Sequence, residues 1–368
     1  MGLTKIRLGD YIRRSTVNNR NLQYGEDLIV GVNNTGVFTT PKGSTNGVNL
    51  KPYKIVETGA FVYNPTRLDL GSIAYRTEGL CIVSHLYMVF YLTDEGKKII
   101  DPQWLFIYFR RKEFQREVTF RNFGSQRPEF NFEDMSDIVI PLPPIDIQQK
   151  YVAVYSAMLA NQQSYERGLE DLKLTCDAYI EKLRRENECF PIGNYVHPYN
   201  EKNINGEITL ERGINIEKCF ITPQRSNDNF YGRKIVRTGQ IAYCTQLNNE
   251  NVAVALRTGP DCIVSNVYDV IEFNDGAGLM PKYLMLWLIR KEFGRFVYWT
   301  SQGTSYEFLT YESLSNYGIP VPSMEIQQDI VNIYEAYLTR KEINEKLKTQ
   351  IKDLCPILIK GSIEEAQG

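Results

Sequence analysis

The chain has 368 residues, of which 43% are hydrophobic and 23% are charged, and its formal net charge is −2. This composition supports folded domains with hydrophobic cores and excludes a disordered or fibrous protein. The near-neutral charge also excludes a protein that is basic over its whole surface, so any contact with nucleic acid requires local basic patches or a basic partner.

The residues with strong metal or redox chemistry are few and scattered. The seven cysteines form no CxxC pair, and the only histidines are His85 and His197. Widely separated cysteines among apolar neighbours are typical of reduced thiols in a cytoplasmic protein. The sequence has neither an apolar run of roughly 18 residues, which a membrane span needs, nor the apolar segment of a secretory signal. We therefore expect a cytoplasmic protein with no membrane segment and no metal site.

Residues 1–144 predict a first domain of α+β class. The segments 53–63 and 81–92 are rich in β-branched and aromatic side chains and are punctuated by Gly, Pro and Asn, which is typical of strands. A helix is expected at about 102–119. A polar loop at 124–127 and a proline-bounded exit follow it.

A first long helix is predicted at 145–188. Pro143 fixes its start, and Asp146 suits its positive N-terminal end. Large side chains recur every seven residues, as they do in helices that pack along a seam. The predicted seam residues are Tyr151, Met158, Tyr165, Leu172 and Tyr179.

Residues 189–322 repeat the first domain. Arg76-Thr77 followed by Cys81-Ile82-Val83-Ser84 returns as Arg257-Thr258 followed by Cys262-Ile263-Val264-Ser265, and Lys112-Glu113-Phe114 returns as Lys291-Glu292-Phe293. A period of about 180 residues is too long for a solenoid and indicates a duplicated domain. The helix at 102–119 has its counterpart at about 281–298.

A second long helix is predicted at 323–358, with seam residues Ile330, Tyr337 and Ile351, and residues 359–368 are expected to form a C-terminal tail. Pro356 is expected to end or kink this helix. If the two helices pair antiparallel, they separate two homologous domains related by a pseudo-two-fold axis. About 40 helical residues span roughly 60 Å, so the pair would act as a spacer. The alternative for such an amphipathic pair is simple dimerisation or core packing.

Both copies carry basic and aromatic residues on the helix of the domain, followed by a small polar loop. Lys and Arg suit phosphate contacts, whereas Arg, Gln, Ser and Thr in the loop suit base edges. The alternative is an ordinary amphipathic helix with one solvated face. The candidate DNA-binding residues are Arg110, Arg111, Lys112, Arg116, Arg121, Ser125, Gln126 and Arg127 in the first copy, and Arg290, Lys291, Arg295, Gln302, Thr304 and Ser305 in the second.

Motifs of catalysis are missing from the sequence. There is no phosphate loop of the form G-x-x-x-x-G-K-[ST], no G-x-G-x-x-G and no Asn/Asp-Pro-Pro-aromatic motif. No compact group of carboxylates with a lysine indicates a nuclease. We therefore expect no catalytic residues on this chain.

The two exits into the long helices resemble the specificity subunit of type I restriction-modification systems. The residues that carry the resemblance are Ile140-Pro141-Leu142-Pro143-Pro144 with Ile147-Gln148-Gln149, and Ile319-Pro320-Val321-Pro322 with Ile326-Gln327-Gln328. One departure is Gln-Gln where the family often has Glu-Gln, a change that we expect at the helix surface.

The resemblance implies two target-recognition domains, each of which reads one half of a split sequence in double-stranded DNA. It also implies that methyltransferase (modification) subunits, two of them, dock on the helices and that a restriction-translocase subunit joins them. S-adenosylmethionine, ATP and Mg²⁺ would then belong to those partners, with no cofactor on this chain. Two alternatives remain open: a duplicated protein-interaction module with a coiled-coil stem and no DNA binding, and the detached recognition half of a fused restriction-methyltransferase.

Overall fold

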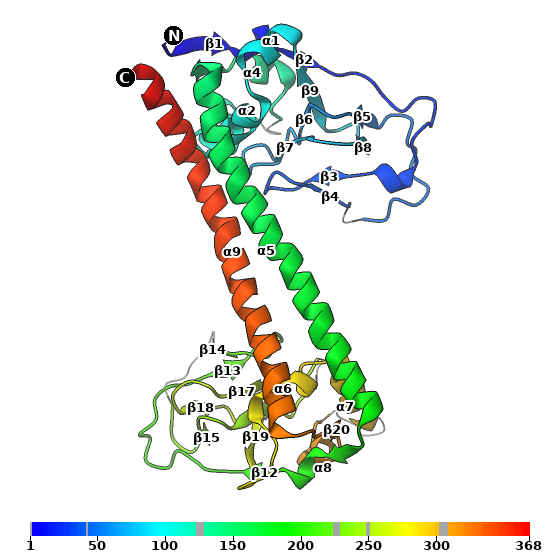
Figure 1. The fold of residues 1–368 in the computed structure, drawn as a ribbon, viewed down its shortest axis with the longest axis vertical. Helices are drawn as coiled ribbons and strands as arrows, with labels where there is room; N and C mark the ends of the chain where they lie inside the picture. The colour runs from blue at the N-terminus through cyan, green and yellow to red at the C-terminus, as the bar shows by residue number, and fades with distance from the viewer. Residues whose placement is uncertain (1, 42, 123–128, 224–228, 248–250, 302–307) are drawn as a thin grey trace. The chain divides into compact units, whose positions relative to one another are not determined.

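The computed structural model describes residues 2–41, 43–122, 129–223, 229–247, 251–301 and 308–368 (Figure 1). The chain divides into two compact units: unit 1 comprises residues 1–166 and 343–368, and unit 2 comprises residues 167–342. Each unit contains one α+β domain and part of each long helix, α5 (Ile145–Glu186) and α9 (Met324–Gln367). The boundary between the units therefore falls inside the two helices.

In unit 1 the main sheet has four antiparallel strands in the order β2-β9-β6-β7. These strands are β2 (Ile12–Arg14), β9 (Met88–Leu92), β6 (Ala60–Tyr63) and β7 (Ile73–Tyr75). Three two-stranded ladders accompany the sheet: β1 (Thr4–Arg7) with β10 (Val139–Leu142), β3 (Gly31–Val32) with β4 (Phe38–Thr39), and β5 (Lys54–Val56) with β8 (Cys81–Val83). The helices of the domain are α1 (Asp94–Ile99), α2 (Pro102–Phe109), α3 (Lys112–Arg121) and α4 (Phe132–Ser136).

Unit 2 repeats this topology. Its four-stranded sheet has the order β12-β19-β16-β17, formed by β12 (Val196–Tyr199), β19 (Tyr268–Phe273), β16 (Ile241–Cys244) and β17 (Val254–Leu256). The ladders are β11 (Cys189–Pro191) with β20 (Gly318–Pro320), β13 (Gly213–Ile214) with β14 (Phe220–Ile221), and β15 (Lys234–Val236) with β18 (Cys262–Val264). The helices are α6 (Pro281–Leu288), α7 (Lys291–Ser301) and α8 (Tyr311–Ser315). The prediction of two homologous α+β domains is confirmed.

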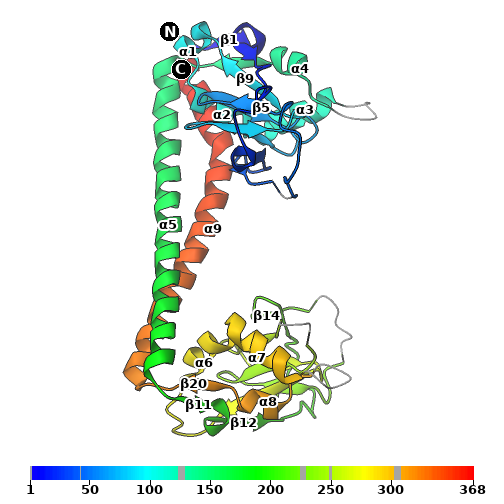
Figure 2. The same cartoon turned by 90° about the vertical axis from the view of Figure 1, so that its right-hand side faces the viewer.

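Helix α2 lies between the sheet of unit 1 and the long helices, as Figure 2 shows. Asp101 caps its N-terminus by accepting hydrogen bonds from the backbone N–H groups of Gln103 and Trp104, and Pro102 occupies the first turn, where no donor is needed. Trp104 is fully buried and donates through Nε1 to Ser362 Oγ at 3.0 Å. The core of unit 1 therefore includes the C-terminal part of α9.

A buried glutamine fixes the start of each long helix. The backbone N–H of Asp101 donates to Gln148 Oε1 at 2.8 Å, and Gln148 Nε2 donates to the carbonyl oxygens of Ile99 at 2.8 Å and Pro143 at 2.7 Å. Gln148 has no exposed surface, because these three backbone groups surround its amide. We expected the change to Gln-Gln to lie at the helix surface. This expectation is wrong for Gln148, which is buried.

Unit 2 reproduces this arrangement around Gln327. The backbone N–H of Met280 donates to Gln327 Oε1 at 2.9 Å, and Gln327 Nε2 donates to the carbonyl oxygens of Gly278 at 2.8 Å and Pro322 at 2.9 Å. Gln327 is likewise fully buried. The exit motif is thus a structural joint that appears twice.

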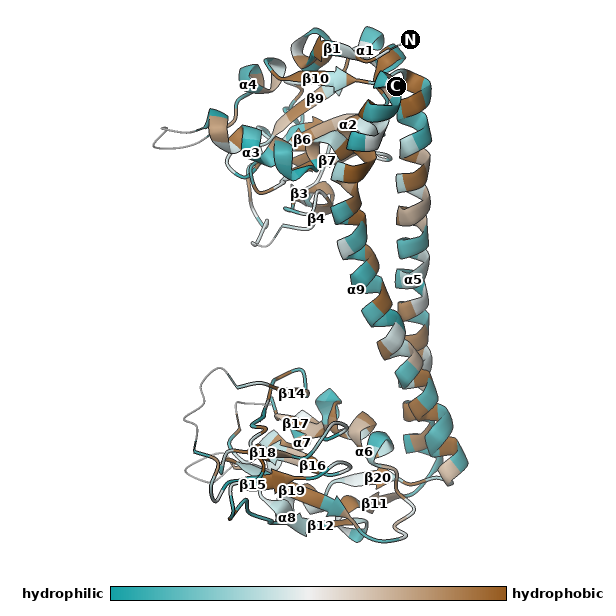
Figure 3. Ribbon diagram, turned by 90° about the vertical axis from the view of Figure 1, so that its left-hand side faces the viewer, coloured by the Kyte–Doolittle hydropathy of each residue, from teal (hydrophilic) through white to brown (hydrophobic). Residues whose placement is uncertain are grey.

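Within each unit the two long helices run antiparallel, and polar and apolar residues alternate along both (Figure 3). In unit 1, Ile351 is 9% exposed and Met158 packs against the same core, while Tyr151 Oη donates to Glu365 at 3.1 Å. In unit 2, Ile330 is fully buried, Tyr179 packs against its core, and Tyr337 stacks on Tyr334. Tyr165 and Leu172 are half-buried.

The seam also contains a buried polar pair, of which Asn344 lies in the heptad row of Ile330, Tyr337 and Ile351, whereas Gln162 lies outside the predicted rows. Gln162 Nε2 donates to Asn344 Oδ1 at 2.9 Å, and the two residues are 5% and 2% exposed. Beside them Lys348 pairs with Glu166 at 2.8 Å. A buried amide pair of this kind specifies the register of two helices.

Of the two outcomes expected at Pro356, an end or a kink of the second helix, the end is wrong. Helix α9 continues through Pro356 to Gln367, so the predicted C-terminal tail at 359–368 is helical almost to its end. Leu358, Ile359 and Ser362 are buried in the core of unit 1. This packing outweighs the loss of one backbone hydrogen bond at the proline. Across the described residues, every helix is too short or too polar to cross a membrane.

Candidate nucleic-acid interface

Helices α3 and α7 carry five of the fourteen predicted DNA-binding residues, all of them cations. Each turns one face into its domain: Phe114 and Val118 are buried in unit 1, and Phe293 and Val297 are buried in unit 2. The spacing of four residues leaves the opposite face of each helix to solvent. Lys112 and Lys291 begin the two helices, and both are exposed.

Three further predicted cations lie on these helices and are held by neighbouring carboxylates. Arg116 pairs with Glu113 at 3.0 Å, and Arg295 pairs with Glu292 at 3.3 Å. Arg121 pairs with Glu117 at 3.0 Å. The side chain of Arg116 is 74% exposed and that of Arg295 is 61% exposed. Exposed pairs of this kind contribute about 0–1 kcal/mol, so exchange of the carboxylate for a phosphate costs little.

Arg110 does not belong to the interface, and the prediction that it contacts DNA is wrong. Its guanidinium donates to the carbonyl oxygens of Gly71 and, at 3.2 Å, Asn34, and the residue is 8% exposed. Burial lowers the pKa of Arg110. The side chain follows the last turn of α2 and therefore points inward, where it ties α2 to the β3–β4 hairpin. Gly36, at φ +78°, leaves the room that the guanidinium occupies.

In unit 2 a different cation makes the equivalent contact between the hairpin and the helix end. Lys218 occupies the position that corresponds to Gly36, also with a positive φ of 61°. Its Nζ donates at 2.6 Å to the carbonyl oxygen of Leu288 at the end of α6, and burial lowers the pKa of Lys218 to about 8. The position that corresponds to Arg110 is Ile289. Sequence reasoning missed this exchange, although alignment of the two copies contains its signal.

Arg111 and Arg290, which correspond to each other, mainly support the fold. Arg111 lies over the ring of Tyr108 at 3.7 Å and donates to the Tyr108 carbonyl oxygen at 3.1 Å. Arg290 forms ion pairs with Glu181 of α5 and with Glu292, and its side chain is 14% exposed. Arg111 therefore holds the corner between α2 and α3, whereas Arg290 links the start of α7 to the long helix α5.

The predicted base-reading residues lie outside the described residues. They are Ser125, Gln126 and Arg127 in the first copy and Gln302, Thr304 and Ser305 in the second. The described chain ends at Asn122 directly after α3 and at Ser301, the last residue of α7. Their assignment as DNA contacts stays a prediction.

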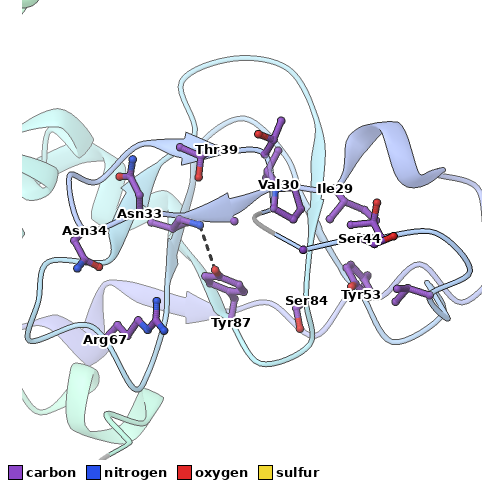
Figure 4. A pocket seen from close by; sticks show the side chains of 17 residues that line it. Ile29, Val30, Asn33, Asn34, Thr39, Ser44, Tyr53, Arg67, Ser84 and Tyr87 are labelled. Carbon is purple, nitrogen blue, oxygen red and sulfur yellow. Dashed lines mark hydrogen bonds between the residues drawn. The ribbon is translucent and has the colours of Figure 1, made fainter. Parts of the chain in front are cut away.

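A polar hollow in unit 1 is a candidate contact region that sequence reasoning missed. It has a volume of 710 Å³ and lies between the β3–β4 hairpin and the segment that follows it (Figure 4). Asn34 and Arg67 lie toward one end, and Ser44 and Tyr53 lie toward the other. Amide, hydroxyl and guanidinium groups are those that bind base edges and phosphates. The sequence signal that could have indicated this region is the hairpin sequence, which recurs in the second copy.

Tyr87 and Asn33 line this hollow and fix the shape of the hairpin beside it. Tyr87 Oη accepts a hydrogen bond from the backbone N–H of Val32 at 3.3 Å. Asn33 Oδ1 accepts from the N–H groups of Thr35 and Val37, each at 3.0 Å, and thereby closes the hairpin turn. The hairpin is therefore shaped by side-chain hydrogen bonds in addition to its short ladder.

Two kinds of reactive side chain, potential metal ligands and thiols, can be located among the described residues. Within the described ranges no three His, Cys, Asp or Glu residues come together as metal ligands. The seven cysteines are free, and burial raises the pKa of Cys81, Cys176, Cys262 and Cys355. A buried thiol with a raised pKa stays protonated and is a poor nucleophile.

Comparison with known proteins adds a family to this geometry. Residues 5–171 and 193–353 match the family model described as Type I restriction modification DNA specificity domain. No curated protein sequence matches the chain.

Three solved structures match the chain over nearly its whole length, two of them with a TM-score above 0.5. The S subunit of a type I restriction-modification system from M. genitalium has a TM-score of 0.57 at 12% identity, over 98% of this chain and 96% of that one. A chain from a structure of complex assembly in a type I R-M system has a TM-score of 0.51 at 16% identity, over 98% and 97%. The HsdS subunit from Thermoanaerobacter tengcongensis has a TM-score of 0.46 at 17% identity, over 100% and 97%.

Proposed function

The chain belongs to the type I restriction modification DNA specificity family, and we propose that it reads a two-part DNA sequence, with one half-site recognised by each domain. The observation that carries this proposal is the duplicated domain, in which α3 and α7 present equivalent exposed cations on equivalent scaffolds. Cations that two domains share suit phosphate contacts, which are the same on every sequence. Residues that differ between the domains are then left to distinguish the bases.

The long helices set the distance between the half-sites in this proposal. They contain 42 and 44 residues, so each is roughly 60 Å long. The glutamine joints support such a role, because they fix where each helix leaves its domain. The buried Gln162–Asn344 pair supports it further, because it opposes sliding of one helix along the other.

Methylation and cleavage are proposed to belong to partner subunits. The chain would direct methyltransferase subunits, and in a full system a restriction-translocase subunit, to the DNA sequence that it reads. S-adenosylmethionine, ATP and Mg²⁺ would then bind to those partners in the cytoplasm. The family match supports this division of work, because the matching model describes a DNA specificity domain.

A domain exchange tests the proposal. The chain is co-expressed with its cognate methyltransferase subunit, and the methylated sequence is mapped by methylation sequencing. Replacing residues 1–144 by the first domain of another family member should change one half-site and leave the other half-site and the gap unchanged. A change in both half-sites would contradict the proposal that each domain reads one half-site. Absence of methylation with the unaltered chain would contradict the proposed function itself.

A further inference from the structure

An exposed stripe of two cations and one aromatic ring recurs on α3 and α7. Its members lie at every fourth position and so share one face of each helix. We call this the cation–aromatic stripe. It consists of Lys112, Arg116 and Phe120 on α3, and of Lys291, Arg295 and Trp299 on α7.

The stripe is shared although packing does not require it. The buried residues of the two helices agree because both helices cover the same kind of core. Positions outside the core lack this constraint, and two of them differ: the exposed Thr119 corresponds to the half-buried Tyr298, and the exposed Arg121 corresponds to the half-buried Thr300. The stripe nevertheless keeps the same order of charge and aromaticity in both copies. A shared external contact explains this agreement.

The rings at the end of the stripe are unusually open to solvent. Phe120 is 81% exposed and Trp299 is 75% exposed. A single exposed aromatic residue on a protein surface needs no explanation. Two of them at equivalent positions of a duplicated domain, each four residues after an exposed arginine, indicate a ring that is buried only when a partner binds.

We propose that Phe120 and Trp299 stack against base pairs of the DNA duplex, partly inserted at a base step, as a sequence-independent anchor of each domain. The inference rests on the proposed function. The two cations before each ring give the stripe the charge that a phosphate backbone attracts. Every base presents a π-face, so the same kind of ring serves two domains that read different half-sites.

Trp299 supplies its own probe. The chain has three tryptophans, of which Trp104 is fully buried and Trp287 is 3% exposed. Acrylamide quenching that is lost in W299F therefore reports on the exposed ring. In the complex with methyltransferase subunits, addition of a duplex carrying the mapped target should protect this component from acrylamide. Unchanged quenching at saturating duplex would overturn the proposal.

Binding measurements separate the ring from the charges. F120A and W299A should each weaken binding of the assembled complex at least about fivefold, on target and scrambled duplexes alike. They should leave the slope of log K against log salt concentration unchanged, because no charge is lost. K112Q should reduce the magnitude of that negative slope by about 0.9, because one phosphate contact is lost. F120W and W299F, which keep a ring, should bind like the unaltered chain.

Matched controls remove other exposed apolar side chains. L86A and I204A replace residues that are 67% and 76% exposed, and they should not change DNA affinity. If the unaltered complex fails to bind DNA, the proposed function fails. If it binds and F120A and W299A bind equally well, only this inference is wrong. If the two variants impair assembly with the methyltransferase subunit and leave DNA affinity intact once assembled, the stripe is a protein-binding surface and the inference is also overturned.

Discussion

Replacing the buried glutamine of one exit joint should destabilise one unit. In Q148L the backbone N–H of Asp101 and the carbonyl oxygens of Ile99 and Pro143 lose the amide that satisfies them. A buried polar group left without a partner costs about 1–3 kcal/mol. Because partial relaxation and water entry recover some of this loss, we expect a decrease of about 2–4 kcal/mol in the free energy of unfolding of unit 1. For a domain of this size that lowers the midpoint by roughly 5–15 °C.

The neighbouring glutamine provides the control. Gln149 is exposed, so Q149L should change stability by less than about 0.5 kcal/mol. Calorimetry combined with hydrogen–deuterium exchange would assign the loss, with faster exchange in α1 and α2 for Q148L and around Met280 for Q327L. Equal stability of Q148L and Q149L would refute the view that the motif is a structural joint. Loss of protection in both units from one substitution would refute its local action.

Three further results are expected. R110A should lower the stability of unit 1 by about 2 kcal/mol in urea unfolding, whereas R116A should stay within about 0.5 kcal/mol and weaken DNA binding instead; the reverse pattern would contradict the burial of Arg110. The pKa of Lys218 is about 8 in the folded chain and about 10.4 when unfolded, so between these pH values the unfolded chain binds more protons and the stability of unit 2 rises with pH. K218M should remove this component of the pH dependence, and an unchanged profile would exclude Lys218 as its source. Insertion of one heptad into each long helix at the boundary between the units should lengthen the gap by about 10 Å, or roughly three base pairs, with both half-sites unchanged in methylation sequencing; an unchanged gap would contradict the spacer proposal.

The fold class, the duplication and the two long helices could be predicted from sequence because each depends on local pattern or on comparison of the two copies. Alternation and turn residues indicate strands, and a seven-residue period indicates a seam. Pro356 misled this reasoning because its cost to the helix is local, whereas the burial of Leu358 and Ile359 that outweighs it depends on tertiary contacts. Local helix propensity does not include the stabilisation that comes from tertiary packing.

The candidate interface was less predictable, since adjacent cations look alike in a sequence. Arg110, Arg111 and Lys112 read as one basic cluster, yet they are respectively buried, stacked on Tyr108 and exposed. The direction of each side chain depends on where α2 ends and α3 begins, and helix ends are the least certain part of a sequence-based assignment. A buried amide such as Gln148 is equally hidden, because its partners are backbone groups of distant segments.

The contact between the hairpin and the helix end is made by Arg110 in unit 1 and by Lys218 in unit 2. This difference allows a test of how the contact is built. In unit 2, K218G removes the cation that caps α6 and relieves a positive φ, while I289R alone adds a second cation beside the first. Together the two substitutions recreate the arrangement of unit 1, in which glycine in the hairpin makes room for an arginine from the helix end. A double-mutant cycle on the unfolding of unit 2 should therefore show a favourable coupling of at least about 1 kcal/mol, beyond the 0.3–0.5 kcal/mol scatter of independent sites. Simple additivity would mean that the two cations serve unrelated purposes, and that the resemblance between the joints is only geometric.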